Sequence, residues 1–167
     1  MADKELLIKE TVEHTGVFSF SGLYSFIHSW LKDQEGYGVV EGKYVEKVSG
    51  NTKEINVDWT ASKVMGDYFK VELGITLKAS DLTDVEVESD GKKKRMNKGK
   101  VSVDIKGTLI KDYKSQWEEK PMNKFLRDVY NKYIIPQRID GMEGKVMGDV
   151  KGLKEQVKNY LELSGKR

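Results

Sequence analysis

Cysteine is absent from this 167-residue chain, which excludes disulfides, thiolate metal sites and cysteine nucleophiles. Long apolar runs are absent too, so the sequence predicts neither a signal peptide nor a membrane-spanning helix. The chain also contains no GxSxG motif, no Walker phosphate loop, no GxGxxG after a strand and no HExxH. Together these absences favour a non-catalytic protein of the reducing cytoplasm, with no cofactor and no bound metal.

A strong excess of charge of one sign is missing as well. The chain holds 29 basic and 27 acidic residues, a net charge of +2, whereas a dedicated nucleic-acid-binding protein usually shows a larger imbalance or a clear basic face. Hydrophobic residues make up 38% of the chain and follow regular patterns, which favours a folded protein over a disordered one. The length, with no linker and no internal repeat, predicts a single domain over residues 1–167.

The beginning of the chain predicts one strand and one amphipathic helix. Leu6, Ile8 and Val12 share one parity, as in a strand with one buried face. Apolar residues then recur at spacings of three and four, which is the period of a helix. They are Leu23, Phe26, Ile27, Trp30 and Leu31. Ser21 is a suitable cap for this helix, and Gly36 is expected to end it.

From residue 37 onward apolar and polar residues alternate, which is the period of a half-buried strand. The clearest examples are "INVDWTA" at 55–61 and "YFKVELGITLKA" at 68–79. Turn-forming stretches separate the runs, among them "KASD" at 78–81. The predicted strands cover 37–48, 55–61, 68–79, 84–89 and 101–105. Short connections favour antiparallel pairing as a meander with one face in water.

The last third of the chain returns to helical spacing. One apolar stripe consists of Phe125, Leu126, Val129, Tyr130, Tyr133 and Ile134. A second, heptad-like stripe consists of Ile139, Met142, Val146, Val150, Leu153, Val157 and Leu161. Pro136, between them, should break or kink the helix. The sequence therefore predicts an α+β fold, in which a curved antiparallel meander carries one N-terminal helix and a long, Pro-interrupted C-terminal helix on its inner face.

This order of strand, helix, antiparallel meander and long C-terminal helix resembles the helix-grip fold of the START and Bet v1-like superfamily. The resemblance implies a curved sheet that wraps the C-terminal helix, with a cavity for an apolar ligand between them. We therefore predict a binding protein that holds a small apolar or amphipathic ligand between the sheet and the C-terminal helix. The inward-facing candidates for ligand contact are Trp59, Phe69, Leu73, Val103 and Met142.

Glu10 and His14 are two further candidates for this site. They share the parity of Leu6, Ile8 and Val12, so a regular strand through His14 would direct both polar side chains inward. Burial without partners would be costly, and a hydrated or ligand-filled cavity would remove that cost. The simpler interpretation is that the strand ends or bulges near Glu10.

The stretch "GKKKRMNKGK" at 91–100 suggests an alternative function. Its six cations are Lys92, Lys93, Lys94, Arg95, Lys98 and Lys100. Such cations either contact the phosphates of a nucleic acid or lie at the solvated tip of a hairpin. The preceding strand carries carboxylates that offset the cations, namely Asp84, Glu86, Glu88 and Asp90. No aromatic residue between 92 and 100 is present to stack on bases, so we favour the hairpin tip and do not expect nucleic acid as the partner.

Glycines form a stripe on the last predicted helix, at Gly141, Gly144, Gly148 and Gly152. At roughly 100° per residue this stripe lies nearly opposite the apolar seam of 139–161. On an open helical face each glycine costs roughly 1 kcal/mol relative to alanine. Two interpretations stay open: the segment is locally mobile, or the smooth stripe admits a partner backbone, as in a homodimer.

Overall fold

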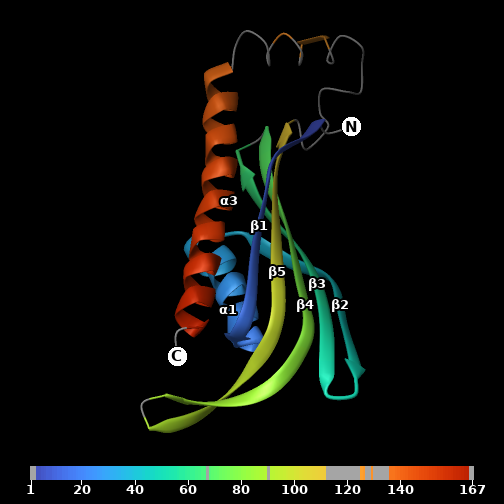
Figure 1. Ribbon diagram of the computed structural model, residues 1–167. Helices are drawn as coiled ribbons and strands as arrows, with labels where there is room; N and C mark the ends of the chain where they lie inside the picture. Colours follow the sequence, from blue (N-terminus) through green and yellow to red (C-terminus); the bar gives the residue numbers. More distant parts are fainter. Residues whose placement is uncertain are drawn as a thin grey trace.

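The computed structural model describes residues 3–66, 68–89, 91–111 and 136–165, together with Phe125, Leu126 and Val129. Within these residues the chain forms a five-stranded antiparallel sheet and two α-helices (Figure 1), so the predicted α+β class is confirmed. The elements, in chain order, are β1 (Asp3–Phe18), α1 (Phe20–Ser29), the short π-helix η1 (Trp30–Gln34), β2 (Gly38–Ser49), β3 (Thr52–Met65), β4 (Phe69–Ser89), β5 (Lys92–Lys111) and α3 (Pro136–Gly165).

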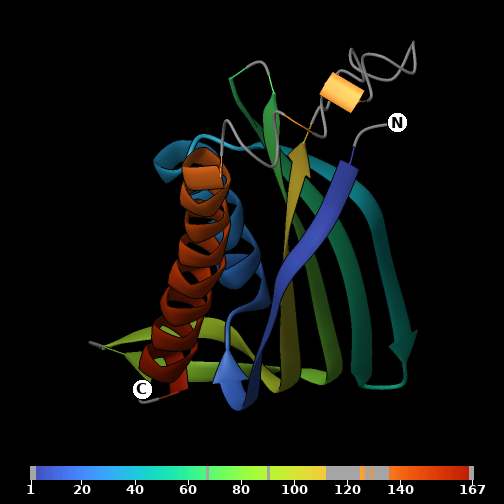
Figure 2. The ribbon, with the colours of Figure 1, turned by 90° about the horizontal axis from the view of Figure 1, so that it is seen from above.

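The strands lie in the order β1-β5-β4-β3-β2, and every neighbouring pair is antiparallel. Strands β2 to β5 follow one another as a meander, and β5 returns beside β1. The sheet is strongly curved, and both helices lie on its inner face (Figures 1 and 2). This arrangement places one hydrophobic core between the sheet and the helices.

Strand β4 corrects the prediction of two separate strands at 68–79 and 84–89. It is one continuous strand, and the stretch predicted to turn is a bulge between Ser80 and Thr83. Asp81 has a left-handed backbone with a φ of 55°. A bulge bends a strand without ending its pairing. The turn-like residues at 78–81 therefore bend the β4–β5 hairpin and do not separate two strands.

The basic stretch is mostly strand rather than turn. β5 begins at Lys92, which pairs with Ser89 at the end of β4. Gly91, between them, has a φ of 75°, a left-handed conformation that favours glycine. The hairpin therefore continues as paired strands past the bulge to its tip, well beyond the core (Figure 1).

Helix α1 begins two residues earlier than the cap at Ser21 predicts. Ser19 is the cap, because its Oγ accepts a hydrogen bond from the N–H of Gly22 at 3.1 Å. The prediction is wrong because the backbone already has the extended cap conformation at Ser19, directly after β1 ends at Phe18. The side chains that α1 and η1 bury are Phe20, Leu23, Ile27, Trp30 and Leu31.

Helix α3 packs on β1 and β5 through the seam that the sequence predicts. Val146, Val150, Leu153, Val157 and Leu161 are each exposed by 1% or less. Gly107 of β5 lies under this seam, where an added Cβ would lie 2.7 Å from Val146 Cγ1 and 2.8 Å from Val150 Cγ2. Glycine at this position therefore lets the helix approach the sheet closely.

The helix predicted before Pro136 falls mostly outside the described residues. Of its apolar stripe only Phe125, Leu126 and Val129 are described, and each is helical. Pro136 itself is the first residue of α3. The predicted interruption of the C-terminal helix thus stays a prediction.

Candidate ligand-binding site

Four of the predicted ligand-binding residues lie in the packed core. Trp59, Phe69, Leu73 and Val103 are each exposed by 2% or less and belong to one cluster with the inner residues of α1 and α3. Met142, on α3, packs against this cluster and is half-buried. Because sheet and helix touch at Gly107, a ligand between them has no room at that point.

Glu10 and His14 both lie on strand β1, and both are half-buried. The expectation that the strand ends or bulges near Glu10 is wrong, because β1 continues to Phe18. Its bulge lies earlier, between Leu6 and Ile8. The regular strand through His14 therefore directs both polar side chains toward the side of the sheet that α3 covers.

Side chains of α3 and β1 meet these two residues. Lys154 Nζ of α3 lies 3.0 Å from Glu10 Oε2, so an ion pair compensates the partial burial of the carboxylate. The ring of His14 contacts Phe18 edge to face, with ring centroids 5.9 Å apart. An open hollow of about 380 Å³ beside them is bordered by His14, Lys154 and Lys158. Glu10 thus belongs to the contact between β1 and α3, and His14 borders the hollow beside that contact.

Three adjoining hollows follow the exposed side of α1, and we call them together the α1 groove. Their volumes are about 420, 190 and 230 Å³. Phe20 and Ser21 border the first and second hollows, and Tyr24 and Ser25 border the second and third. The groove is also lined by Tyr44, Lys53, Ile55, Leu82, Asp84, Arg95, Met96 and Asn97 from the sheet, by Ser19 at the cap of α1, and by His28 and Ser29 of α1.

The groove is open because the helices cover only part of the sheet. Tyr44 of β2 pairs in register with the buried residue Val57, so its side chain belongs to the inner face. Even so, Tyr44 is 48% exposed, and Val48 further along β2 is 66% exposed. In Figure 2, α3 lies at the opposite side of the sheet from β2. The inner side of β2 is therefore largely open to solvent at Tyr44 and Val48, although Tyr24 of α1 reaches Glu41 further along the strand.

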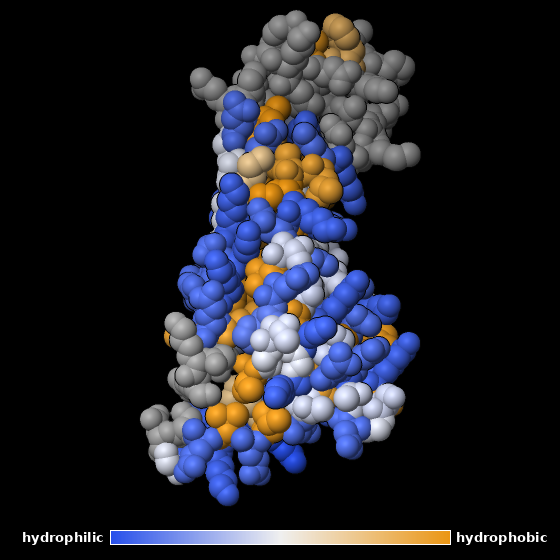
Figure 3. All heavy atoms as spheres, viewed as in Figure 1, coloured by the Kyte–Doolittle hydropathy of each residue, from blue (hydrophilic) through white to orange (hydrophobic). Residues whose placement is uncertain are grey.

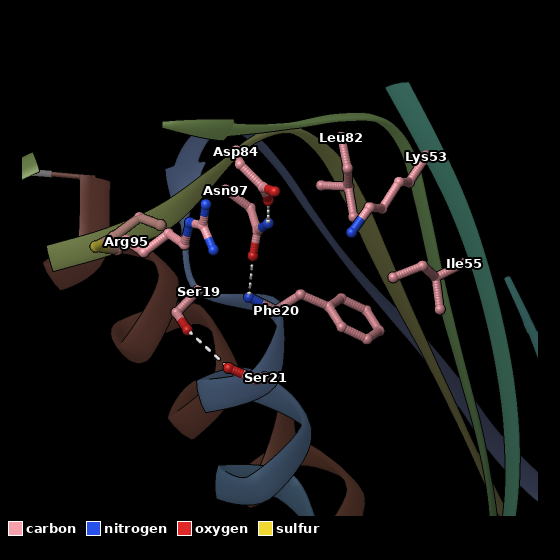
Figure 4. A pocket seen from close by; sticks show the side chains of 10 residues that line it. Ser19, Phe20, Ser21, Lys53, Ile55, Leu82, Asp84, Arg95 and Asn97 are labelled. Atoms are coloured by element: carbon pink, nitrogen blue, oxygen red, sulfur yellow. Dashed lines mark hydrogen bonds between the residues drawn. The ribbon is translucent and has the colours of Figure 1, made fainter. Parts of the chain in front are cut away.

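The end of the groove nearest the β4–β5 hairpin is polar (Figure 4). Asn97 Oδ1 accepts a hydrogen bond from the N–H of Phe20 at 2.9 Å, and Asn97 Nδ2 donates to Asp84 Oδ1 at 3.2 Å. Asn97 thereby joins the start of α1 to the hairpin. Arg95 and Lys53 add two cations beside these groups, and no carboxylate in the described part of the chain lies within salt-bridge distance of Arg95.

The middle of the groove is aromatic. The ring of Tyr24 packs edge to face on Trp59, with centroids 4.6 Å apart, and His28 packs on the same indole at 5.8 Å. The Tyr24 hydroxyl donates to Glu41 Oε1 at 2.8 Å, and burial together with this bond raises the pKa of Tyr24. Trp59, a predicted ligand-binding residue, thus lies directly beneath two side chains that line the groove.

The six cations of the basic stretch do not form one surface. Lys93 and Arg95 lie on the inner side of β5, in register with Glu88 and Glu86 of β4. Lys92, Lys94, Lys98 and Lys100 alternate to the outer side. Among the described residues of the hairpin, the carboxylates Asp84, Glu86 and Glu88 therefore share a side with Lys93 and Arg95 and not with the other four cations.

One buried polar cluster is absent from the sequence-based predictions. Tyr37 is 2% exposed, and its hydroxyl donates to Asp149 Oδ2 at 2.5 Å. Lys145 Nζ lies 3.2 Å from Asp149 Oδ1 and 3.4 Å from Glu35 Oε2. Burial and the Asp149 carboxylate raise the pKa of Tyr37 strongly. Burial alone would lower the pKa of Lys145, but the carboxylates of Asp149 and Glu35 raise it overall. The cluster joins α3 to the segment between η1 and β2.

The glycine stripe of α3 is open at three of its four positions. A Cβ added at Gly141, Gly144 or Gly148 would meet no atom of the described residues within 4 Å. At Gly152 such a Cβ would lie 3.7 Å from Cζ2 of Trp30, which is ordinary contact. The mobile segment and the homodimer interface both stay predictions.

No family model matches the chain, and no curated protein or solved structure is significantly similar to it. In the part of the chain that the structure describes, no helix has both the length and the apolar character needed to cross a bilayer. Among the same residues, no three His, Asp or Glu side chains gather as a metal ion would require. The α1 groove is the candidate site that the geometry itself supplies.

Proposed function

We propose that the protein binds a small amphipathic ligand and that this ligand lies in the α1 groove. The observation that carries the proposal is the exposed ring of Tyr44 on the inner side of β2, in a hollow that adjoins a larger one of about 420 Å³. Ligand pockets are typically about 300–1,000 Å³ and combine apolar walls with a few polar groups. The first hollow alone reaches that size, and the two adjoining hollows extend it along α1.

The middle of the groove and its end near the hairpin suit the two parts of such a ligand. Phe20, Tyr24 and Tyr44 supply aromatic surface for an apolar part. Because Tyr44 is half exposed without a ligand, covering its ring would stabilise a complex by roughly 25 cal/mol per Å² of apolar surface. Arg95 and Lys53 offer donors to a polar head group at the hairpin end.

The proposed position differs from the one that the helix-grip resemblance implies. The element order and the curved sheet around α3 support that resemblance. The close contact at Gly107, however, favours a ligand beside α1 rather than between the sheet and α3. The lack of cysteine is compatible with a single-domain binding protein of the cytoplasm, which is the setting we propose.

Filling the groove should prevent binding. Ser21 is exposed and borders two of the hollows, so Ser21→Trp places an indole in the ligand's path. Gln156→Trp is the matched control, because Gln156 is exposed on α3 and does not border the groove. The affinity for 8-anilino-1-naphthalenesulfonate, an amphipathic probe, can be measured by titration calorimetry. S21W should weaken this affinity about tenfold or more, which corresponds to about 1.4 kcal/mol, and Q156W should leave it unchanged.

Mass spectrometry of an organic extract from natively purified protein should also identify a bound small molecule. The S21W protein should lose that molecule, while the Q156W protein keeps it. Equal probe affinity in all three proteins, together with an empty extract from the wild type, would remove the proposal.

A further inference from the structure

We propose that the outer face of the β4–β5 hairpin docks on an anionic lipid surface. This outer hairpin face consists of Lys92, Lys94, Lys98 and Lys100 of β5 with Val85 and Val87 of β4. It lies on the side of the hairpin opposite Asp84, Arg95 and Asn97, so the inference does not depend on the α1 groove.

The two strands separate the charges of the hairpin by face. Asp84, Glu86 and Glu88 alternate to the inner side, where Lys93 and Arg95 oppose them. From Thr83 to Lys98 the outer side of the described strands carries lysines and no carboxylate. A low overall net charge therefore conceals a local positive surface, which an anionic partner would complement.

Apolar side chains lie between these lysines. Val85 faces Met96 across the hairpin, and Val87 faces Lys94. Val85 and Val87 are partly exposed, and so is Met96, which also borders the first hollow of the α1 groove. At a bilayer surface such side chains can enter the acyl boundary while lysine stems extend their charges to the phosphates.

A nucleic acid suits this face less well than a lipid surface does. A phosphate backbone offers nothing to Val85, Val87 and Met96. Binding to single strands commonly adds stacking of bases on aromatic rings, and residues 83–100 include no aromatic residue. The apolar centre is therefore the feature that favours lipid.

The shape of the hairpin makes the outer face accessible to a flat surface. Beyond the bulge the hairpin extends past the body of the protein, in Figure 1 at its lower end and in Figure 2 beside α3. In the space-filling view of Figure 3, hydrophobic atoms lie among hydrophilic ones at this end of the molecule. A bilayer can meet the hairpin there without contacting α3.

Co-sedimentation with vesicles tests the proposal with two charge-matched variants. The double variant Lys94→Ser/Lys98→Ser removes two lysines of the outer hairpin face. The control Lys32→Ser/Lys93→Ser removes one lysine of η1 and one lysine of the inner side of β5. Each lysine near a membrane surface strengthens binding roughly fivefold, so K94S/K98S should weaken binding to phosphatidylserine-containing vesicles about 25-fold. The K32S/K93S protein should stay within about fivefold of the wild type, and pure phosphatidylcholine vesicles should bind none of them.

Val85→Thr with Val87→Thr separates lipid from nucleic acid, because threonine keeps the branched shape and the strand preference of valine. This variant should bind the anionic vesicles several-fold more weakly than the wild type. Thermal unfolding checks that every variant is folded. Equal losses in the two lysine variants, or no vesicle binding by the wild type at low salt, would overturn the proposal. A different result would assign the face to nucleic acid instead: the wild type binds duplex DNA or RNA but not vesicles, and this binding weakens in K94S/K98S but not in V85T/V87T.

Discussion

Replacing Gly107 by alanine tests how firmly α3 rests on the sheet, and therefore whether a ligand has room between them. The added Cβ would lie 2.7 Å from Val146 Cγ1, 2.8 Å from Val150 Cγ2 and 3.0 Å from Ile8 Cγ2. All three neighbours are methyl groups of β-branched side chains, which have few alternative rotamers. The contact can be relieved only if the helix or the strand moves.

The expected cost follows from two opposing effects. Overpacking a well-packed core typically costs ~1–3 kcal/mol. Replacing glycine by alanine within a strand otherwise raises the free energy of unfolding by roughly 0.5–1 kcal/mol, because glycine loses more conformational freedom on folding. With the middle of each range, we expect G107A to lower the free energy of unfolding by about 1 kcal/mol.

Urea denaturation gives this free energy directly, and the chain offers a matched control. Gly148→Ala adds the same methyl group to α3 where no described atom lies within 4 Å, so it should stabilise the protein by roughly 1 kcal/mol. The double variant G107A/V146A should be more stable than the sum of its single changes predicts, because shortening Val146 makes room for the new methyl group.

An unchanged stability of G107A would refute the reasoning. So would strict additivity of G107A and V146A, since residues in contact should be energetically coupled. In either case the sheet and α3 would not be in firm contact at Gly107. The ligand position predicted between them from the sequence would then regain support over the α1 groove.

Two further predictions concern α3. Because the pKa of Tyr37 is raised, the Tyr37 hydroxyl keeps its proton in the native state, whereas in the unfolded chain it loses the proton above about pH 10. The stabilisation is therefore fully present below that pH, and above it the free energy of unfolding falls by about 1.4 kcal/mol per pH unit. Urea denaturation at rising pH should show this additional slope in the wild type and not in Tyr37→Phe, and equal slopes would contradict it. Amides of 141–152 should exchange hydrogen faster than those of 69–79, because open glycines weaken the helix by roughly 1 kcal/mol each. Equal protection, together with a cross-linked dimer through the glycine stripe, would instead favour an interface.

The sequence predicted best what depends on burial of one face. Ile55, Val57, Trp59 and Ala61 alternate in the sequence, and all four are buried. The seam of α3 was equally predictable, because its heptad-like spacing reflects continuous packing on the sheet. Burial leaves a periodic trace along the chain, so elements defined by burial can be recognised without any knowledge of their neighbours.

Features that depend on single hydrogen bonds or on pairing were predicted less well. Residue type alone does not locate the cap of α1, because Ser19 and Ser21 are equally suitable and only the hydrogen bond from Gly22 distinguishes them. The residues around Asp81 predict a turn but form a bulge, because turns and bulges favour similar residues. Tyr37 and Asp149 are 112 positions apart, so no local pattern indicates their hydrogen bond.

The α1 groove illustrates a different limit. Alternation identifies Tyr44 as an inner residue of β2, but it does not tell whether a helix covers that part of the inner face. Coverage depends on where α1 and α3 lie, and these positions follow from contacts such as that of Asn97 with Phe20. A site made by incomplete coverage therefore has no signature of its own in the sequence.

The basic stretch shows how strand register decides what a cluster of charges can do. As a turn, its cations would mix in solvent with the neighbouring carboxylates and largely cancel their field. As a strand, β5 directs Arg95 toward the α1 groove and Lys94 and Lys98 to the opposite face. One run of the sequence thus contributes to two surfaces with different charge, and only the outer one lacks carboxylates among its described residues. A ligand at the inner face and a lipid surface at the outer face would then use neighbouring residues without competing for them.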